Sequence, residues 1–191
     1  MAFGFYFDMT RCIGCRACQI ACKDKNRLDV GVVLRNAKTY ECGTFPKVEM
    51  FNYSASCNHC GNPACVAVCP VGAMYKAEDG TVIHDDAACI GCQACVGACP
   101  YEVPQYDEVA KIVKKCDACA YLRAQGKNPA CVDACPNRAL EFGDIDELKA
   151  LHGDDCVSDI CILPASSMTE PNVLIKAKKC AVDGDVVELP L

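Results

Sequence analysis

The stretch CIGCRACQIAC at residues 12–22 places four cysteines at the spacing C-x2-C-x2-C-x3-C. CIGCQACVGAC at residues 89–99 repeats this spacing, while CNHCGNPACVAVC (57–69) and CDACAYLRAQGKNPACVDAC (116–135) lengthen only the middle gap. In such a run a tight backbone turn directs three thiolates at one iron–sulfur cluster, and the fourth cysteine binds a second cluster. Sixteen of the twenty cysteines fall into these four groups, so the sequence predicts four [4Fe–4S] clusters.

Two other uses of cysteine fit this pattern less well. A disulfide scaffold would not repeat this kind of spacing, with a proline directly after the last cysteine of three groups (Pro70, Pro100 and Pro136). Zinc sites are built from two C-x2-C pairs and lack the C-x3-C-P ending. Because four clusters would fill much of the interior of a chain of 191 residues, we expect the protein without iron to fold poorly.

The cysteine groups also repeat as two related pairs. The first and third groups agree at eight of eleven positions, and NPACVAVCP and NPACVDACP in the second and fourth agree at seven of nine. The second and third groups are joined by a segment with Asp79-Gly80 between β-forming residues, which predicts a short β-hairpin. Residues 57–100 therefore look like a complete two-cluster ferredoxin, around which the first and fourth groups must pair.

Exchange of the fourth ligand, as in two-cluster ferredoxins, predicts four sets of iron ligands. They are set 1 (Cys12, Cys15, Cys18 and Cys135), set 2 (Cys22, Cys116, Cys119 and Cys131), set 3 (Cys57, Cys60, Cys65 and Cys99) and set 4 (Cys69, Cys89, Cys92 and Cys95). The alternative is that each group binds its own cluster without exchange.

The predicted fold class is α+β: two ferredoxin-like two-cluster units of short helices and β-hairpins around four iron–sulfur clusters, with an extended C-terminal arm. Residues 1–56 and 101–155 are assigned to an outer unit, residues 57–100 to an inner unit and residues 156–191 to the arm. Strands are expected at 3–8, 140–142 and 172–176, hairpins at 32–55 and 104–114, and helices at 17–26, 94–98 and 144–152. Asp144 is the expected N-cap of the last helix and Gly153 its end.

Charge and motifs exclude several classes of function. The formal net charge is −6, and thiolate-ligated clusters would add negative charge, so we expect no nucleic-acid partner. No Ser/His/Asp set, paired carboxylates or phosphate-binding glycine loop is apparent, so we expect no catalytic site in this chain. The opening MAFGFYFDMTRC lacks the features of a targeting segment, and no apolar run is long enough to cross a membrane. We expect the chain to meet a membrane only through a partner, on either the cytoplasmic or the exported side.

Four cysteines lie outside the groups: Cys42, Cys156, Cys161 and Cys180. The simplest interpretation is that these thiols have no ligand role. The alternatives are a disulfide between Cys156 and Cys161 and an additional metal site.

Several stretches beyond the cysteines resemble one family. CNHCGNPAC, CPYEVPQY, KCDACAYLRAQGKNPACVDACPNRALEFG and EPNVLIK, in this order, are similar to the iron–sulfur subunit of dimethyl sulfoxide reductase and its relatives. The resemblance spans about residues 3–177 and supports the nested pairing of the ligand sets. It implies a molybdenum (or tungsten) bis-pterin catalytic subunit and a quinol-oxidising membrane anchor as partners. It also implies that set 1 faces the catalytic subunit and set 4 the quinone side.

The sequence therefore favours an electron-transfer subunit of a molybdenum or tungsten oxidoreductase, which relays electrons between a donor and a pterin site. A free polyferredoxin that serves a hydrogenase or several soluble enzymes is the alternative, because the cysteine groups alone allow it. The arm at residues 156–191 and the family-like stretch after the fourth group favour the subunit.

Overall fold

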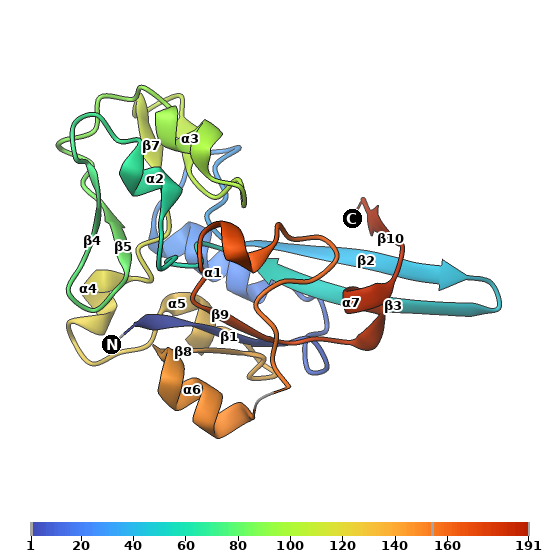
Figure 1. Ribbon diagram of the computed structural model, residues 1–191. Coiled ribbons are helices and arrows are strands. Elements are labelled where there is room, and N and C mark those ends of the chain that lie inside the picture. The colour runs from blue at the N-terminus through green and yellow to red at the C-terminus, as the bar shows by residue number, and fades with distance from the viewer. Residues whose placement is uncertain (1, 154, 191) are drawn as a thin grey trace.

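The computed structural model describes residues 2–153 and 155–190; residues 1, 154 and 191, which fall within the predicted outer unit and arm, lie outside the described residues. Within the described part, the chain forms short helices and four small β-sheets (Figure 1). The strands are β1 (Phe3–Asp8), β2 (Asn36–Thr44), β3 (Lys47–Ala55), β4 (Met74–Lys76), β5 (Val82–His84), β6 (Gln105–Asp107), β7 (Ile112–Lys114), β8 (Leu140–Asp144), β9 (Val173–Lys176) and β10 (Val186–Leu189). The helices are α1 (Ala17–Lys25), α2 (Ala64–Ala67), α3 (Ala94–Ala98), α4 (Ala120–Arg123), α5 (Ala130–Asp133), α6 (Ile145–His152) and α7 (Lys179–Asp183), with a 3-10 turn at Ser166–Met168. None of these helices is long and apolar enough to span a bilayer.

One three-stranded sheet joins strands from distant parts of the sequence. β1 pairs antiparallel with β8 and parallel with β9, which gives the order β8-β1-β9. Phe5, Phe7 and Ile175 on these strands are buried in the largest core. Because β1 leads into Cys12 and β8 follows Cys135, this sheet brings the first and fourth cysteine groups together.

A long hairpin forms the second three-stranded sheet and projects from the body of the molecule (Figure 1). β2 pairs with β3 from Asn36 opposite Ala55 to Thr44 opposite Lys47, and β10 pairs antiparallel with the other edge of β2. The hairpin starts four residues later than the predicted range of 32–55. Val32 and Leu34 instead pack into a core with Cys22, Cys57 and Cys116.

Two short hairpins enclose the second and third cysteine groups. β4 pairs with β5, as the Asp79-Gly80 turn predicts, and β6 pairs with β7. Met74 and Val82 from the first hairpin and Val113 from the second pack against Cys65 and Cys95. Helices α2 and α3 and strands β4, β5 and β7 thus gather at one end of the molecule (Figure 1).

The predicted mixture of short helices and small sheets is confirmed, and β1 and α3 have the predicted bounds. The segment after residue 155 contains more structure than an extended arm. It supplies β9, α7 and β10, and its residues Ile160, Ile175 and Ala181 are buried in the largest core. Helix α7 and strand β10 were not expected, because each is stabilised by β2, which lies far away in the sequence.

Helix α6 begins at the predicted cap. The Asp144 carboxylate accepts hydrogen bonds from the backbone N–H groups of Asp146 (3.0 Å) and Glu147 (3.3 Å). These bonds satisfy two of the N–H groups that the first helical turn leaves without a partner. Leu148 then packs against Tyr6 and Leu174, so the cap fixes the helix on one face of the β8-β1-β9 sheet.

We predict that Asp144→Ala opens α6 locally without changing the rest of the fold. Loss of an N-cap carboxylate costs about 1 kcal/mol, so amide hydrogens of residues 145–152 should exchange roughly five-fold faster. Hydrogen–deuterium exchange of the purified protein, read by mass spectrometry, measures this. Asp146→Ala is the matched control, because it removes a carboxylate from the same turn but keeps the cap. Equal exchange in the two variants would contradict the capping role.

Candidate iron–sulfur centres

All four cysteine groups contain a left-handed residue two positions after the first cysteine. These residues are Gly14 (φ 69°), His59 (φ 45°), Gly91 (φ 67°) and Ala118 (φ 51°). The turn carries the backbone N–H of that residue back to the first thiol, at 3.5 Å from Cys57 Sγ in the second group and 3.4 Å from Cys116 Sγ in the fourth. The groups therefore share a loop geometry that supplies N–H donors to sulfur, although only two of them use glycine.

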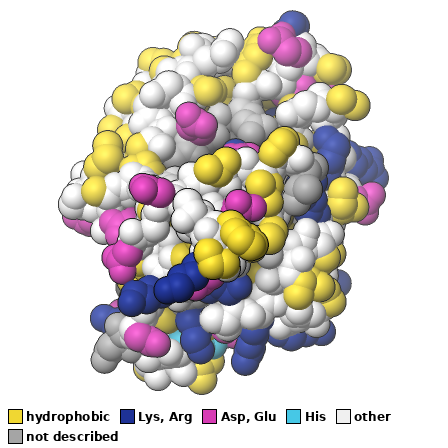
Figure 2. Space-filling view, turned by 90° about the vertical axis from the view of Figure 1, so that its right-hand side faces the viewer, with side chains coloured by type: hydrophobic (Ala, Val, Ile, Leu, Met, Phe, Trp, Pro, Cys, Tyr) yellow, Lys and Arg dark blue, Asp and Glu magenta, His cyan; other side chains and the backbone are white. Residues whose placement is uncertain are grey.

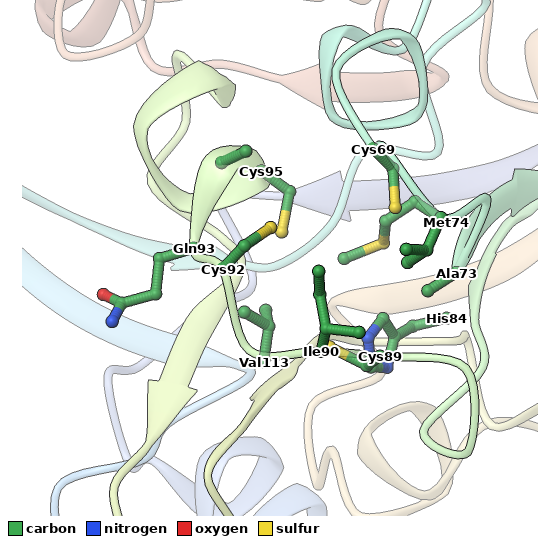
Figure 3. Close-up of a pocket in the computed structure, with 12 residues that line it drawn as sticks. Cys69, Ala73, Met74, His84, Cys89, Ile90, Cys92, Gln93, Cys95 and Val113 are labelled. Atoms are coloured by element: carbon green, nitrogen blue, oxygen red, sulfur yellow. The ribbon is translucent and has the colours of Figure 1, made fainter.

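Set 4 surrounds one cavity. Cys69, Cys89, Cys92 and Cys95 line it, and Figure 3 shows the sulfur atoms of Cys92 and Cys95 next to each other, with Cys69 on the other side near Met74. Burial by itself would raise the pKa of the Cys69 thiol. The backbone N–H groups of residues 71 to 74 donate to its sulfur and outweigh burial, so the pKa lies below its usual value. Donors directed at sulfur in this way stabilise a thiolate.

Set 1 surrounds a second cavity, formed by the first and last cysteine groups. Cys12, Cys15, Cys18 and Cys135 line it together with Phe7 and Leu140. Cys18 Sγ lies 3.3 Å from Ser54 Oγ, and Cys135 Sγ accepts a hydrogen bond of 3.2 Å from the backbone N–H of Ala139. The fourth cysteine of the last group thus lies beside the first three of the first group.

The thiols of set 3 are crowded together in the interior. Burial raises the pKa of Cys65 to about 12, and the neighbouring thiols of Cys57, Cys99 and Cys60 add to this rise. The pKa of Cys60 is raised to about 11, again first by burial and then by Cys57 and Cys99. Cys99 therefore lies with the first three cysteines of the second group.

Set 2 is crowded in the same way. Burial raises the pKa of Cys22 to about 11; Arg35 opposes this, and the thiols of Cys131 and Cys119 add to it. The pKa of Cys116 is raised by burial and next by Cys22. Thiols this close can all be ionised only if a positive charge lies between them, and ligation to a metal supplies it.

The distances between the thiols test which metal species would fit. In the part of the chain that the structure describes, none of the sixteen cysteines belongs to a trio of ligand atoms within 4.8 Å of one another. A single tetrahedral ion requires ligands about 3.3 to 3.8 Å apart, given Zn–S bonds of about 2.3 Å. The wider spacing leaves room for a multi-atom cluster and disfavours zinc at these positions.

Two cations are buried among the thiols. Arg35 is 2% exposed, and its guanidinium donates to the Ser54 carbonyl oxygen (2.9 Å) and to Ser56 Oγ (2.7 Å). Lys115 is 7% exposed, and its ammonium donates to the carbonyl oxygens of Val82 and Cys116. No carboxylate of the described residues lies within 4.0 Å of either cation.

The thiols are what balances these charges. Burial alone would lower the pKa of Arg35, but the thiols of Cys131, Cys116 and other ligand cysteines outweigh it and raise the pKa. The same holds for Lys115. Burial would lower its pKa, but the thiols of Cys57, whose Sγ lies 3.4 Å from Nζ, and of Cys116 outweigh burial and raise the pKa. A buried charge without a counter-charge is costly, so the interior fits an anionic, thiolate-ligated group. Neither cation could be recognised from the sequence, because no local pattern distinguishes them from surface Arg and Lys.

The structure also excludes one of the three interpretations of the remaining cysteines. The disulfide between Cys156 and Cys161 is wrong, because both are free thiols. Cys156 packs against Tyr6 and Leu148, whereas the backbone N–H of Cys161 donates to Ala181 in a different region.

Comparison with known families agrees with this chemistry. Residues 48–145 match the 4Fe–4S dicluster domain, and residues 9–27 match a 4Fe–4S binding domain. Together with the shared loop geometry, these matches define the protein as a ferredoxin-like iron–sulfur protein that transfers electrons.

Individual relatives narrow the class. The protein is 46% identical over 182 residues to the B subunit of anaerobic dimethyl sulfoxide reductase from Escherichia coli (strain K12), across 91% of this sequence and 88% of the relative. It is 45% identical over 193 residues to the same subunit from Haemophilus influenzae, across 96% and 93%. Protein NrfC of Escherichia coli (strain K12) is 43% identical over 148 residues, across 76% and 66%.

The protein therefore belongs to the family of the iron–sulfur subunit of anaerobic dimethyl sulfoxide reductase, and the resemblance drawn from its motifs is confirmed. The number of clusters, the sixteen cysteines as their ligands and the partner subunits remain predictions.

Proposed function

We propose that this chain holds four [4Fe–4S] clusters, one at each of sets 1 to 4, and relays electrons to a molybdenum or tungsten bis-pterin catalytic subunit. A bound cluster of this kind accepts and releases single electrons at a potential set by its surroundings. The order in which the four thiol sets follow one another through the interior carries this proposal.

Neighbouring sets share a hydrophobic core, which supports a single row from set 1 to set 4. The largest core holds Cys18 of set 1 and Cys131 of set 2, the second holds Cys116 of set 2 and Cys57 of set 3, and the third holds Cys65 of set 3 and Cys95 of set 4. Sets that share a core lie close together, and stepwise electron transfer through a protein requires short separations between its redox centres.

The row has two accessible ends. Cys15 of set 1 and Cys92 of set 4 are exposed, whereas most thiols of sets 2 and 3 are buried. The apolar neighbours Ile13 and Ile90, in the two CIGC loops, are 64% and 63% exposed. One exposed apolar side chain thus lies beside the thiols at each end, where a docked partner would cover it.

We therefore assign one partner to each end. The relatives are named as one subunit of a reductase, which supports a catalytic subunit of that class at one end. Following the family resemblance, set 1 would face this molybdenum or tungsten subunit, and set 4 would face a quinol-oxidising membrane anchor. Electrons would then leave the quinol at set 4 and reach the pterin site from set 1.

Anaerobic purification of the native protein, with identification of bound subunits and analysis of Fe, Mo and W, tests the proposal. We expect a stable complex with a large subunit, about sixteen irons per copy of this chain and one Mo or W. The same iron without a large subunit or Mo and W would instead establish a free polyferredoxin. Eight irons or fewer would contradict the four clusters.

We predict that Cys135→Ser perturbs the cluster at set 1. Electron paramagnetic resonance of the reduced protein should lose the same signal in Cys135→Ser as in Cys15→Ser, because both residues would ligate one cluster. Cys119→Ser should remove a different signal. If Cys135→Ser instead matched Cys119→Ser, each group would bind its own cluster and the exchanged pairing would be wrong.

We predict that Lys115→Gln makes the clusters at sets 2 and 3 harder to reduce. A buried unit charge at roughly 5 to 8 Å and an effective dielectric constant near 20 contributes about 2 to 3 kcal/mol, so potentials should fall by on the order of 100 mV. Redox titration followed by electron paramagnetic resonance measures the shift. Lys127→Gln makes the same charge change at an exposed position and should leave the potentials unchanged. Equal potentials in both variants would exclude a role for the Lys115 charge.

A further inference from the structure

A fifth group of metal-ligating side chains lies outside the four sets. The Sγ atoms of Cys42 and Cys180 and a carboxylate oxygen of Glu49 lie within 4.8 Å of one another. No other trio of His, Cys, Asp or Glu ligand atoms among the described residues meets this limit. We propose that Cys42, Cys180 and Glu49 bind one zinc ion.

Tertiary structure brings these residues together from three elements. Cys42 on β2 lies directly opposite Glu49 on β3, and Val186 of β10 pairs with Cys42 from the other side. Helix α7 precedes β10 and contains Cys180, whose Sγ lies beside Cys42 and Glu49. These elements lie on the side of the molecule shown at the right of Figure 1, which faces the viewer in Figure 2.

The donor set suits zinc better than other common cations. Two thiolates and one carboxylate are ligands that Zn²⁺ takes in tetrahedral sites, whereas Ca²⁺ and Mg²⁺ require oxygen ligands throughout. A small closure would bring the three atoms to the separation of about 3.3 to 3.8 Å that zinc ligands adopt. The atoms open onto a surface cavity, also lined by Thr44, Lys47 and Asp185, with space for water as a fourth ligand.

The local electrostatics disfavour three ionised groups without a cation. Cys42 is 3% exposed and donates a hydrogen bond of 3.6 Å to the Glu49 carbonyl oxygen. Burial raises the pKa of Cys180 to about 12, and its neighbours Cys42 and Glu49 raise it as well. Lys47 lines the cavity but forms no ion pair with Glu49 within 4.0 Å in the described residues.

The distribution of the remaining thiols argues in the same direction. The backbone N–H of Cys161 donates a hydrogen bond of 2.8 Å to the carbonyl oxygen of Ala181, which is next to Cys180. The thiol of Cys42 is also close enough to that of Cys161 to raise the pKa of Cys161. Three of the four cysteines outside the cluster groups thus gather at one place. Cys156 alone packs elsewhere, against Tyr6 and Leu148, so it provides a matched control.

Metal analysis of the intact, iron-loaded protein is the first test. We expect about one zinc per chain in addition to the cluster iron, and zinc-edge X-ray absorption showing two sulfur and two lighter ligands. This absorption edge is specific to zinc, so cluster iron does not obscure it. Zinc with four sulfur ligands would overturn the proposal, because it would mark zinc in a cluster position.

Substitutions then assign the ligands. Cys42→Ser and Cys180→Ser should each lower bound zinc at least ten-fold with unchanged iron, and Glu49→Gln should weaken zinc binding about ten-fold in a chelator competition. Cys156→Ser should keep both metals at the wild-type level. Unchanged iron shows that each variant has folded. Iron-loaded wild-type protein that takes up no zinc, or that contains a Cys42–Cys180 disulfide in its place, would overturn the proposal.

Discussion

Two positive charges in the interior, on Arg35 and Lys115, have cysteine sulfur rather than carboxylate as their counter-charge. Burying a guanidinium or an ammonium is costly unless negative charge lies close by. Here the negative charge comes from the thiols of sets 1 to 3, so the fold and the proposed clusters would depend on one another. The short helices lead to the same conclusion, because α2, α4 and α5 have four residues each and cannot be stable by themselves. α2 and α5 contain the proposed iron ligands Cys65 and Cys131, and α4 directly follows Cys119, so ligation would anchor all three helices.

The β8-β1-β9 sheet explains how groups distant in sequence come to share a site. Its central strand, β1, leads directly into the first cysteine group, and its antiparallel neighbour, β8, directly follows the fourth group. Closing this sheet therefore moves Cys135 beside Cys12, Cys15 and Cys18, while the two short hairpins close around the second and third groups. The nested order of the sets follows from these two closures. The same nesting leaves one end set exposed on each side and two sets buried between them.

The sequence was informative wherever the structure is local. Cysteine spacing, the Asp79-Gly80 turn and the Asp144 cap are patterns within a few residues, and the corresponding loops and elements formed as predicted. Arg35, Lys115, β10 and the Cys42–Glu49–Cys180 trio could not be predicted in this way. Each depends on contacts between segments far apart in the chain, such as β10 against β2. His59 shows that a local motif can also escape prediction. It has the left-handed backbone that glycine adopts in the first and third groups, but the identity of a histidine does not indicate such a conformation.

In the proposed row of four clusters, the positions of the two cations would affect how evenly electrons move from one cluster to the next. Adding an electron to a buried cluster places negative charge in a medium of low dielectric constant, so sets 2 and 3 would be the hardest to reduce if burial acted alone. Arg35 lies beside thiols of sets 1 and 2, and Lys115 beside thiols of sets 2 and 3. Set 4, at an exposed end, has no such cation among the described residues and relies on backbone N–H groups around Cys69. The two cations thus lie where solvent is excluded, and in the proposed row of clusters they would offset the cost of reducing the two buried ones.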